Sequence, residues 1–399
     1  MKGVGIDDTT REDMVRRKES SLLMIIGLFY PVVGGAEKVC QTLSKRFMEK
    51  GIAVTILTQY RDGLPEHEVI DGISVYRKMK GWHPFGLVYM FSVLSFLIKN
   101  RGRFDVIQCF GLFLFIPPAV LMKYLCGKKV VLRLLCSGDC GDFAGIKQLP
   151  FKRLIIAAAK RCDRIIYLSH DIQCELLEHH FPPEKLVCIP NGVDVERFVP
   201  LERSGCQGSK NICFVGRIEA QKGLEFLMRA MAIITSRDSD VTLTLVGEGQ
   251  QRAALEGLAR GLALGQRVVF TGLVENVLPY YHSARVFVLP SLSEGMSSSL
   301  LEAMSCGLPV VTTLVGGSKE IVDASLEVEK MAPASYHVGE RGILIYPADV
   351  DGMAEALLKL LHDDSLSGRL GEKAQAYIRS RFSQEHVVGE YIHLYHQLI

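Results

Sequence analysis

The sequence predicts an α/β protein of two Rossmann-like, doubly wound domains that face a central cleft. Apolar runs with the length of buried strands alternate with helical segments in both halves of the chain. Glycine-containing turns follow several of these runs, where parallel sheets place their ligands. The 399 residues, 48% of them apolar, are enough to form two hydrophobic cores.

The first half opens with residues 1–20, a charged segment that we interpret as a disordered tail because it lacks the apolar stretch of a signal peptide. A buried strand is predicted at Ser21–Gly27. Gly34 and Gly35 then precede a helix that extends to Lys50, and another strand follows. A glycine pair at this point lets the backbone approach a ligand, and the helix start can bind phosphate. The alternative is an ordinary turn.

Further strands are predicted at Asp105–Phe110 and Lys129–Leu135. The second strand ends in a polar, glycine-rich loop, Cys136–Phe143, at the edge where open α/β sheets bind ligands. Ser137 and Asp139 are its candidate substrate-binding residues. The alternative role for both is that of polar turn residues.

The distribution of charge along the chain bears on whether the protein binds a membrane surface. Residues 1–200 carry 28 Lys and Arg against 21 Asp and Glu, and the remaining residues carry 18 against 23. Lys147–Arg164 reads as a basic amphipathic helix, which suits either an anionic membrane surface or packing on the sheet. The apolar run Phe85–Ile98 is shorter than the about 20 residues that cross a bilayer. The 11 cysteines form no C-x-x-C pair, which favours reduced thiols.

The second half begins after a polar linker, residues 201–210, with a strand at Ile212–Val215. Gly216 ends this strand, and Arg217 and Lys222 follow on one loop at the sheet edge. Two such cations can converge on a diphosphate, since arginine clamps oxygens bidentately and lysine acts as a point charge. The alternative is a surface loop with two solvated charges.

The segment Pro290–Thr312 reads as strand end, loop, helix and next strand. Glu294 stands in the loop with Gly295 and Met296, the helix begins near Ser297 and Ser298, and Glu302 lies inside it. The amide groups at a helix start hold anions, and small residues there let a phosphate approach closely. Glu294 could then bind hydroxyl groups on one side of the anion, and Glu302 could bind them on the other. The pattern indicates a nucleotide sugar, whereas the alternative is two helix-associated carboxylates without a ligand.

This segment, with Glu294 and Glu302 separated by seven residues, resembles the signature of retaining glycosyltransferases of family 4, which have the GT-B fold. Three further segments resemble that family: G-G-x-E at Gly34–Glu37, I-P-N-G-V-D at Ile189–Asp194 and G-R-x-x-x-x-K-G at Gly216–Gly223. Many members carry a histidine in the loop after the strand at residues 129–135, and this chain has none there.

The resemblance implies an N-terminal acceptor domain (residues 21–200), a C-terminal donor domain (residues 211–382) and a final helix (residues 383–399) that returns to the first domain. It implies that Arg217, Lys222 and Glu294 are catalytic, that Glu302 holds the ribose, and that the loop containing Val274 lies against the base. No Asp-x-Asp motif follows a predicted strand, so we expect neither a metal nor another cofactor.

The expected reaction is retaining hexosyl transfer from a UDP- or GDP-linked sugar to a glycan or lipid-linked acceptor, in the cytoplasm or at the inner face of the membrane, without a nucleic-acid partner. Two rival functions remain open. A nucleotide-sugar 2-epimerase shares the architecture but needs no acceptor. A non-catalytic GT-B subunit would only bind partners, and the intact set of charged site residues argues against it.

Overall fold

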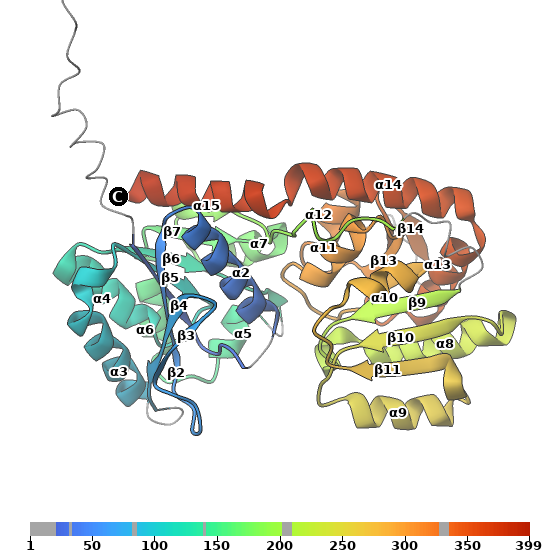
Figure 1. Ribbon diagram of the computed structural model, residues 1–399, viewed down its shortest axis with the longest axis horizontal. Coiled ribbons are helices and arrows are strands. Elements are labelled where there is room, and N and C mark those ends of the chain that lie inside the picture. The colour runs from blue at the N-terminus through green and yellow to red at the C-terminus, as the bar shows by residue number, and fades with distance from the viewer. Residues whose placement is uncertain (1–20, 32–33, 82–85, 139–140, 202–209, 327–334) are drawn as a thin grey trace, which may run out of the picture.

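The protein forms two α/β domains that lie side by side and are joined along one side by two helices, α14 and α15 (Figure 1). The computed structural model describes residues 21–31, 34–81, 86–138, 141–201, 210–326 and 335–399. The tail at residues 1–20 and most of the linker at 201–210 lie outside these residues. Each domain contains one predominantly parallel sheet, so the predicted fold class is confirmed.

The N-terminal sheet has the order β3-β4-β2-β1-β5-β6-β7-β8, and only β3 pairs antiparallel within it. Its strands are β1 (Ser21–Ile26), β2 (Ala53–Gln59), β3 (His67–Ile70), β4 (Ile73–Met79), β5 (Val106–Phe110), β6 (Lys129–Arg133), β7 (Arg164–Tyr167) and β8 (Leu186–Cys188). Successive residues of β1 face opposite sides of the sheet, and both sides are covered by helices. This explains why the strand reads as a continuous apolar run.

Helices α3, α4 and α6 contribute to the hydrophobic core on one face of this sheet, and α2 and α15 cover the other. The helical elements are α2 (Gly35–Glu49), α3 (Gly86–Lys99), η1 (Arg101–Arg103), α4 (Ile116–Cys126), α5 (Asp142–Ile146), α6 (Lys152–Ala159), α7 (His170–Glu178) and η3 (Pro183–Lys185). The prediction of one helix across Lys147–Arg164 is therefore wrong. Pro150 and the left-handed Phe151 (φ 63°) separate α5 from α6, because proline disfavours a helical residue before it and Phe151 leaves the helical region.

The C-terminal sheet has the order β11-β10-β9-β12-β13-β15-β14, with β14 antiparallel at the edge. Its strands are β9 (Asn211–Val215), β10 (Thr242–Val246), β11 (Val268–Gly272), β12 (Val286–Leu289), β13 (Val310–Thr313), β14 (Tyr336–Val338) and β15 (Ile343–Ile345). The helical elements are η5 (Ala220–Lys222), α8 (Leu224–Arg237), α9 (Arg252–Gly261), η6 (Gly265–Arg267), α10 (Leu278–Ser283), α11 (Ser298–Ser305), α12 (Ser318–Asp323), α13 (Val350–His362) and α14 (Asp364–Arg381).

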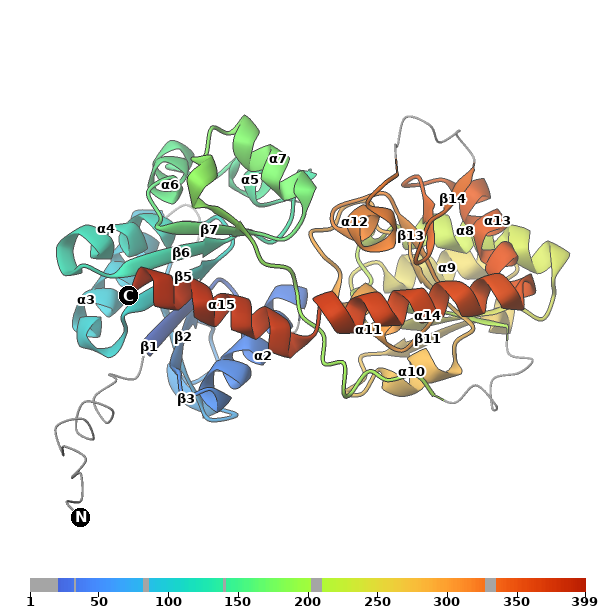
Figure 2. The same cartoon turned by 90° about the horizontal axis from the view of Figure 1, so that it is seen from above.

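The chain passes between the domains twice, and the two crossings are hydrogen-bonded to each other. Val193 on the first crossing donates its N–H to the carbonyl of Phe382 (2.8 Å) and accepts from the N–H of Gln384 (2.9 Å) on the second. Beyond this point α15 (Gln384–Leu398) packs on α2 of the N-terminal domain, with the Phe47 ring 5.8 Å from that of Tyr391. Figure 2 shows α14 and α15 running end to end over the two domains.

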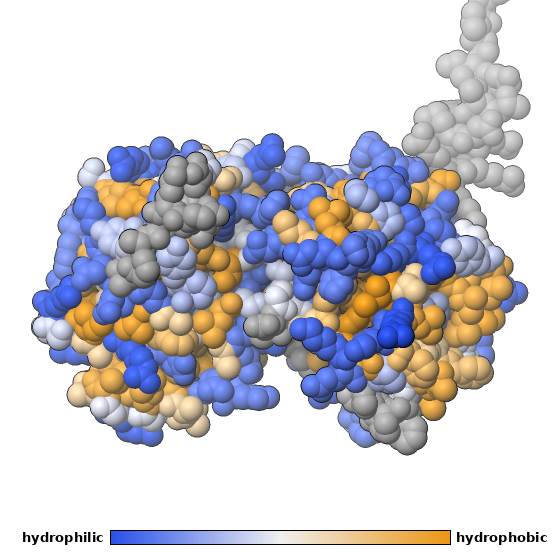
Figure 3. Space-filling model, turned by 180° about the vertical axis from the view of Figure 1, so that it is seen from behind, coloured by the Kyte–Doolittle hydropathy of each residue, from blue (hydrophilic) through white to orange (hydrophobic). Residues whose placement is uncertain are grey.

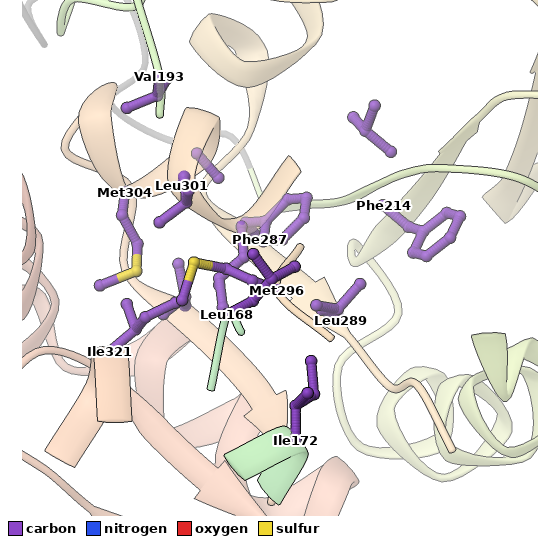
Figure 4. Packing of buried hydrophobic residues seen from close by; sticks show 14 of the residues in the cluster. Leu168, Ile172, Val193, Phe214, Phe287, Leu289, Met296, Leu301, Met304 and Ile321 are labelled. Atoms are coloured by element: carbon purple, nitrogen blue, oxygen red, sulfur yellow. The ribbon is translucent and has the colours of Figure 1, made fainter. Parts of the chain in front are cut away.

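The domains also meet through an apolar contact. Met296, in the loop before α11, belongs to one continuous buried cluster with Leu168 and Ile172 of the N-terminal domain and Ile321 of the C-terminal domain. Figure 4 shows these side chains gathered around Met296. The loop that carries Glu294 and Met296 is therefore held between the two domains.

Candidate active site

The candidate site residues of the C-terminal domain lie in the loops after β9, β11 and β12 and on α11. The loop before α11 is where this domain meets the N-terminal one. Parallel strands end at one edge of a sheet, so segments far apart in sequence come together there. The structure places Lys222 and Glu294, 72 residues apart, in direct contact.

Lys222 and Glu294 form an ion pair in which both side chains are largely buried. Ser291 donates its hydroxyl to the same carboxylate oxygen of Glu294 (3.0 Å). Gly223 lets the two loops approach each other, because its φ is 61° and a Cβ there would clash with the carbonyl of Pro290. The pair therefore places a cation and a carboxylate at one point of the cleft.

The start of α11 adjoins this pair. Ser297 is the N-cap, and its hydroxyl accepts a hydrogen bond from the N–H of Leu300 (3.4 Å), while Ser298 begins the helix. Gly295 lies so close to the N-terminal domain that a Cβ would overlap the carbonyl oxygen of Leu135. The small residues thus let the other domain approach the positive end of this helix.

Met296 in the same loop is fixed from the other domain. Asn191 donates its side-chain N–H to the carbonyl of Met296 (2.7 Å), and the buried Arg133 hydrogen-bonds to the amide oxygen of Asn191. The Asn-Gly turn after β8 is therefore a connection between the domains, which the sequence motif alone did not reveal.

Glu302, the second carboxylate of the motif, has partners on both of its oxygens. Lys38 of α2 reaches across from the N-terminal domain to place its Nζ 2.7 Å from Oε1. The buried Tyr281 of α10 donates its hydroxyl to Oε2 (2.8 Å). Burial, with the charge of Glu302 as a further cause, raises the pKa of Tyr281 well above its ordinary value, so Tyr281 remains a donor.

Arg217 is exposed and is not part of the Lys222–Glu294 pair, although both cations come from the same loop. Its charge acts on Glu37 in the first turn of α2, next to Gly34 and Gly35. Burial raises the pKa of Glu37, whereas backbone hydrogen bonds and the charge of Arg217 oppose this rise. The charge of Arg217 on the C-terminal domain therefore reaches Glu37, next to the first glycine motif on the N-terminal domain.

The loop after β6 meets the loop before α11. Ser293 donates its hydroxyl to the carbonyl oxygen of Ser137 (3.0 Å) and lies 3.5 Å from the thiol sulfur of Cys136. At Ser137 this interdomain contact is made by the backbone. The predicted site residue Asp139 lies outside the described residues.

Asp142 holds this loop in place. Its carboxylate accepts hydrogen bonds from the backbone N–H groups of Leu112 (2.8 Å), Leu135 (2.6 Å) and Cys136 (3.1 Å). Removal of the carboxylate from water raises the pKa of Asp142, and these hydrogen bonds oppose that rise. Asp142 thus orients the loop at the point where family members often carry a histidine.

A cavity of about 310 Å³ opens beside Glu302. It is bordered by α2, by residues 192–198 of the first crossing, by the start of α15, and by Ser298 and Glu302. Gly216 is half-buried at the end of β9, and Val274 is half-buried in the loop after β11. Arg197 of the crossing donates to the side chain of Asn276 in that second loop (3.1 Å).

Sequence reasoning missed both Lys38 and Tyr281 as site residues. Tyr281 does pack against Phe198 and Phe287, but its hydroxyl also contacts Glu302. Neither contact leaves a local signal, because Lys38 and Glu302 are 264 residues apart and Tyr281 comes from a different helix.

Comparison with solved structures shows that the protein has the GT-B fold. Sucrose-phosphate synthase from Thermosynechococcus elongatus superimposes with a TM-score of 0.79 at 22% identity, covering 95% of this chain and 99% of that one. Anabaena HepE in complex with UDP-glucose superimposes with a TM-score of 0.74 at 18% identity, covering 94% and 99%.

The chain belongs to glycosyltransferase family 4. The family described as "Glycosyltransferase Family 4" matches residues 33–197, and that described as "Glycosyl transferases group 1" matches residues 209–363. An uncharacterized glycosyltransferase of Methanocaldococcus jannaschii is 29% identical over 92% of this chain and 95% of its own length.

Two further relatives have named activities. The N-acetyl-alpha-D-glucosaminyl L-malate synthase of Bacillus anthracis is 24% identical, covering 93% of this chain and 96% of its own length. The GDP-mannose-dependent alpha-(1-6)-phosphatidylinositol monomannoside mannosyltransferase of Mycolicibacterium smegmatis is 26% identical, covering 88% and 91%.

Proposed function

We propose that this glycosyltransferase transfers a hexosyl group, with retention of configuration, from a UDP- or GDP-linked sugar to a glycan or lipid-linked acceptor. The observation that carries the proposal is the convergence of Lys222, Glu294, the start of α11 and Glu302 at one edge of the donor domain. In this arrangement Lys222 and the start of α11 supply positive charge for a diphosphate. Glu294 and Glu302 supply one carboxylate for the group on each side of the diphosphate. Among the relatives and neighbours, one uses GDP-mannose and one was solved with UDP-glucose.

In the proposed reaction the bond between the anomeric carbon and the diphosphate oxygen breaks, and a bond to the acceptor oxygen forms on the same face. The acceptor proton passes to a phosphate oxygen of the leaving diphosphate. Arg217, Lys222 and the amides at the start of α11 stabilise the charge that grows on that diphosphate. Glu294 would hold sugar hydroxyls, and Glu302 would hold the ribose at the edge of the adjoining cavity. The step requires no metal.

Other contacts of the proposed donor come from backbone and small residues. Gly34, Gly35, Gly216, Gly295, Met296, Ser297 and Ser298 would let the phosphates approach closely, and the backbone around Val274 would lie against the base. Ser137 would face the acceptor side. The reaction would take place in the cytoplasm, where the cysteine usage of the chain fits reduced thiols. A lipid-linked acceptor would bring the enzyme to the inner face of the membrane as a peripheral protein.

A thermal-shift comparison of UDP, GDP, ADP and TDP tests the donor base. A ligand that binds only the native state stabilises it by RT ln(1 + [L]/Kd), about 2.7 kcal/mol at a hundredfold excess over Kd. We expect a shift with UDP or GDP that disappears in the Glu302→Gln variant. No shift with any of the four would contradict the proposed donor site.

A product assay separates the proposal from its rivals. A transferase consumes the nucleotide sugar in proportion to an added acceptor, whereas a 2-epimerase converts it without one. A binding-only subunit would leave it unchanged.

A further inference from the structure

The N-terminal domain exposes hydrophobic side chains on its outer helices. Among the described residues, nineteen large hydrophobic side chains are exposed; eight of them belong to three helices of one layer, and a ninth, Phe151, directly precedes the third helix. They are Leu87, Val88, Phe91 and Ile98 of α3, Leu121, Tyr124 and Leu125 of α4, and Phe151 and Leu154 at the start of α6. We call these nine side chains the flank patch. Scattered exposed hydrophobic residues are ordinary, but concentration on one layer marks an interaction surface.

The three helices are neighbours. Helix α4 packs against both α3 and α6, and Lys123 of α4 donates to the carbonyl of Arg161 after α6 (2.9 Å). The start of α3 also approaches the start of α6, because a Cβ on Gly86 would lie 3.1 Å from Pro150. Figure 3 shows hydrophobic side chains gathered over the outer part of the N-terminal domain.

Cations accompany the flank patch. They are Lys99, Arg101, Arg103, Lys152, Arg153 and Arg161, all exposed, and none forms an ion pair with a carboxylate that the structure describes. Because the parallel strands make the helices run in one direction, these cations lie at both ends of the layer.

Within the segment that forms this layer, the described acidic residues are not exposed. Among the described residues from 86 to 164, the acidic ones are Asp105, Asp142 and Asp163, and none of them is exposed. Asp142 accepts backbone hydrogen bonds, and Asp163 pairs with Lys123 (2.8 Å). The layer therefore presents apolar side chains with positive charge at their margins.

We propose that the flank patch and its cations dock the enzyme on an anionic lipid membrane. Apolar side chains would enter the boundary between headgroups and acyl chains, and the cations would contact lipid phosphates. A second copy of the chain fits less well, because a twofold interface would place the same cations of both copies together. Since the patch is separate from the donor site, the proposal does not depend on the donor or the acceptor.

Vesicle co-sedimentation of the full chain tests the proposal. The probes are vesicles of phosphatidylcholine alone, and vesicles in which about one third is phosphatidylglycerol, each at about 0.1 M and about 1 M salt, where the Debye length falls from about 10 to about 3 Å. We expect binding to the anionic vesicles that weakens at high salt. Absence of binding to anionic vesicles at low salt overturns the proposal.

Two double variants locate the surface. Lys152→Gln with Arg153→Gln removes two cations, each contributing about 1 kcal/mol near an anionic membrane, so binding should weaken about 30-fold. Phe91→Ser with Leu125→Ser removes two side chains of the patch, which are 73% and 62% exposed, and should also weaken binding. Both variants should retain the wild-type nucleotide thermal shift, which shows that they are folded.

Matched controls lie elsewhere on the surface. Arg229→Gln with Lys373→Gln removes two exposed cations of the C-terminal domain, and Val69→Ser removes an exposed apolar side chain of β3. Neither control should alter vesicle binding. An equal loss of vesicle binding in the control variants would overturn the assignment to a membrane. So would a wild-type dimer that forms without lipid and dissociates in the patch variants, because the patch would then be a contact between two copies.

Discussion

The Nζ atom of Lys38 lies 2.7 Å from Oε1 of Glu302, so a lysine of the N-terminal domain contacts the carboxylate that we assign to the donor ribose. The Lys38 side chain is half exposed, whereas that of Glu302 is almost fully buried. This contact couples the spacing of the two domains to the occupancy of the donor site, because a ribose at Glu302 must share the carboxylate with Lys38 or displace it.

The first prediction concerns this contact. Lys38→Met should let the donor-free enzyme open, which would raise its radius of gyration in small-angle scattering, and donor should restore the compact form. Thermal stability should change little, since an ion pair with an exposed partner contributes about 0–1 kcal/mol. The control is Lys45→Met on the same helix, because Lys45 pairs with Asp71 inside its own domain (2.7 Å). Identical scattering of Lys38→Met and wild type would refute the coupling.

Tyr281→Phe should raise the KM for the donor about tenfold with a smaller effect on kcat. The variant keeps the ring contacts with Phe198 and Phe287 but loses the hydroxyl that donates to Glu302, and a hydrogen bond to a charged group contributes about 1.5–3 kcal/mol. Steady-state kinetics with varied donor measure this. The neighbouring Tyr280→Phe should behave as wild type. An unchanged KM in Tyr281→Phe would mean that Glu302 does not need this partner.

Lys222→Ala should lower turnover about 10²–10³-fold, the usual loss for one oriented electrostatic group in a transition state. It should also lower the melting temperature, because it leaves the buried carboxylate of Glu294 without its cation. The double variant Lys222→Met with Glu294→Gln should recover stability but not turnover. Full activity of Lys222→Ala would eliminate the proposed diphosphate site.

Activity should persist in EDTA. The prediction rests on the two cations of the loop after β9, Arg217 and Lys222. The Asp-x-Asp sequence Asp349–Asp351 follows β15, but Asp349 is the N-cap of α13, where its side chain accepts a hydrogen bond from the N–H of Gly352. The assay compares initial rates with EDTA, with magnesium and with neither. A complete loss in EDTA that magnesium reverses would show that a metal neutralises the diphosphate.

The lowered pKa of Asp238 leads us to expect that the stability of the protein depends on pH. Its hydrogen bonds with Lys210 (2.7 Å) and His362 (2.8 Å) lower its pKa to about 2. Because the folded pKa lies below the unfolded value of about 3.9, the stabilisation is present above that value and is lost as pH falls towards 2.

The melting temperature of the wild type should consequently fall more steeply between about pH 5 and pH 2.5 than that of Asp238→Asn. Asp240→Asn is the control, since the side chain of Asp240 is 79% exposed and lies 4.0 Å from Lys210. Parallel pH profiles for wild type and Asp238→Asn would contradict the assigned pKa shift.

The alternation of strands and helices in both halves could be predicted from the sequence, because buried parallel strands are continuous apolar runs and glycines follow them in the turns. The helix break at Pro150–Phe151 was less visible, since the basic and apolar pattern continues across it. The antiparallel edge strands β3 and β14 were not predicted. They are short and only partly buried, so their composition carries little signal.

The candidate site, like the fold, could be predicted only in part from the sequence. Glu294 and Glu302 belong to one local segment and could be recognised by spacing. The pairing of Lys222 with Glu294, and the contacts of Lys38 and Tyr281 with Glu302, depend on how distant segments meet in space. The hydrophobic periodicity of a sequence carries no information about contacts between such distant segments.

The paired crossings at Val193 and Gln384 have a consequence for protein engineering. Helix α15 follows the C-terminal domain in sequence but packs on α2, so the C-terminal domain is inserted into the N-terminal domain rather than appended to it. A chimaera that takes a new C-terminal domain from another family member must therefore exchange residues 194–382 as an internal segment. A simple fusion at residue 210 would import a foreign α15 and mismatch the surface around Phe47, even if both parent domains were individually well suited to the new substrates.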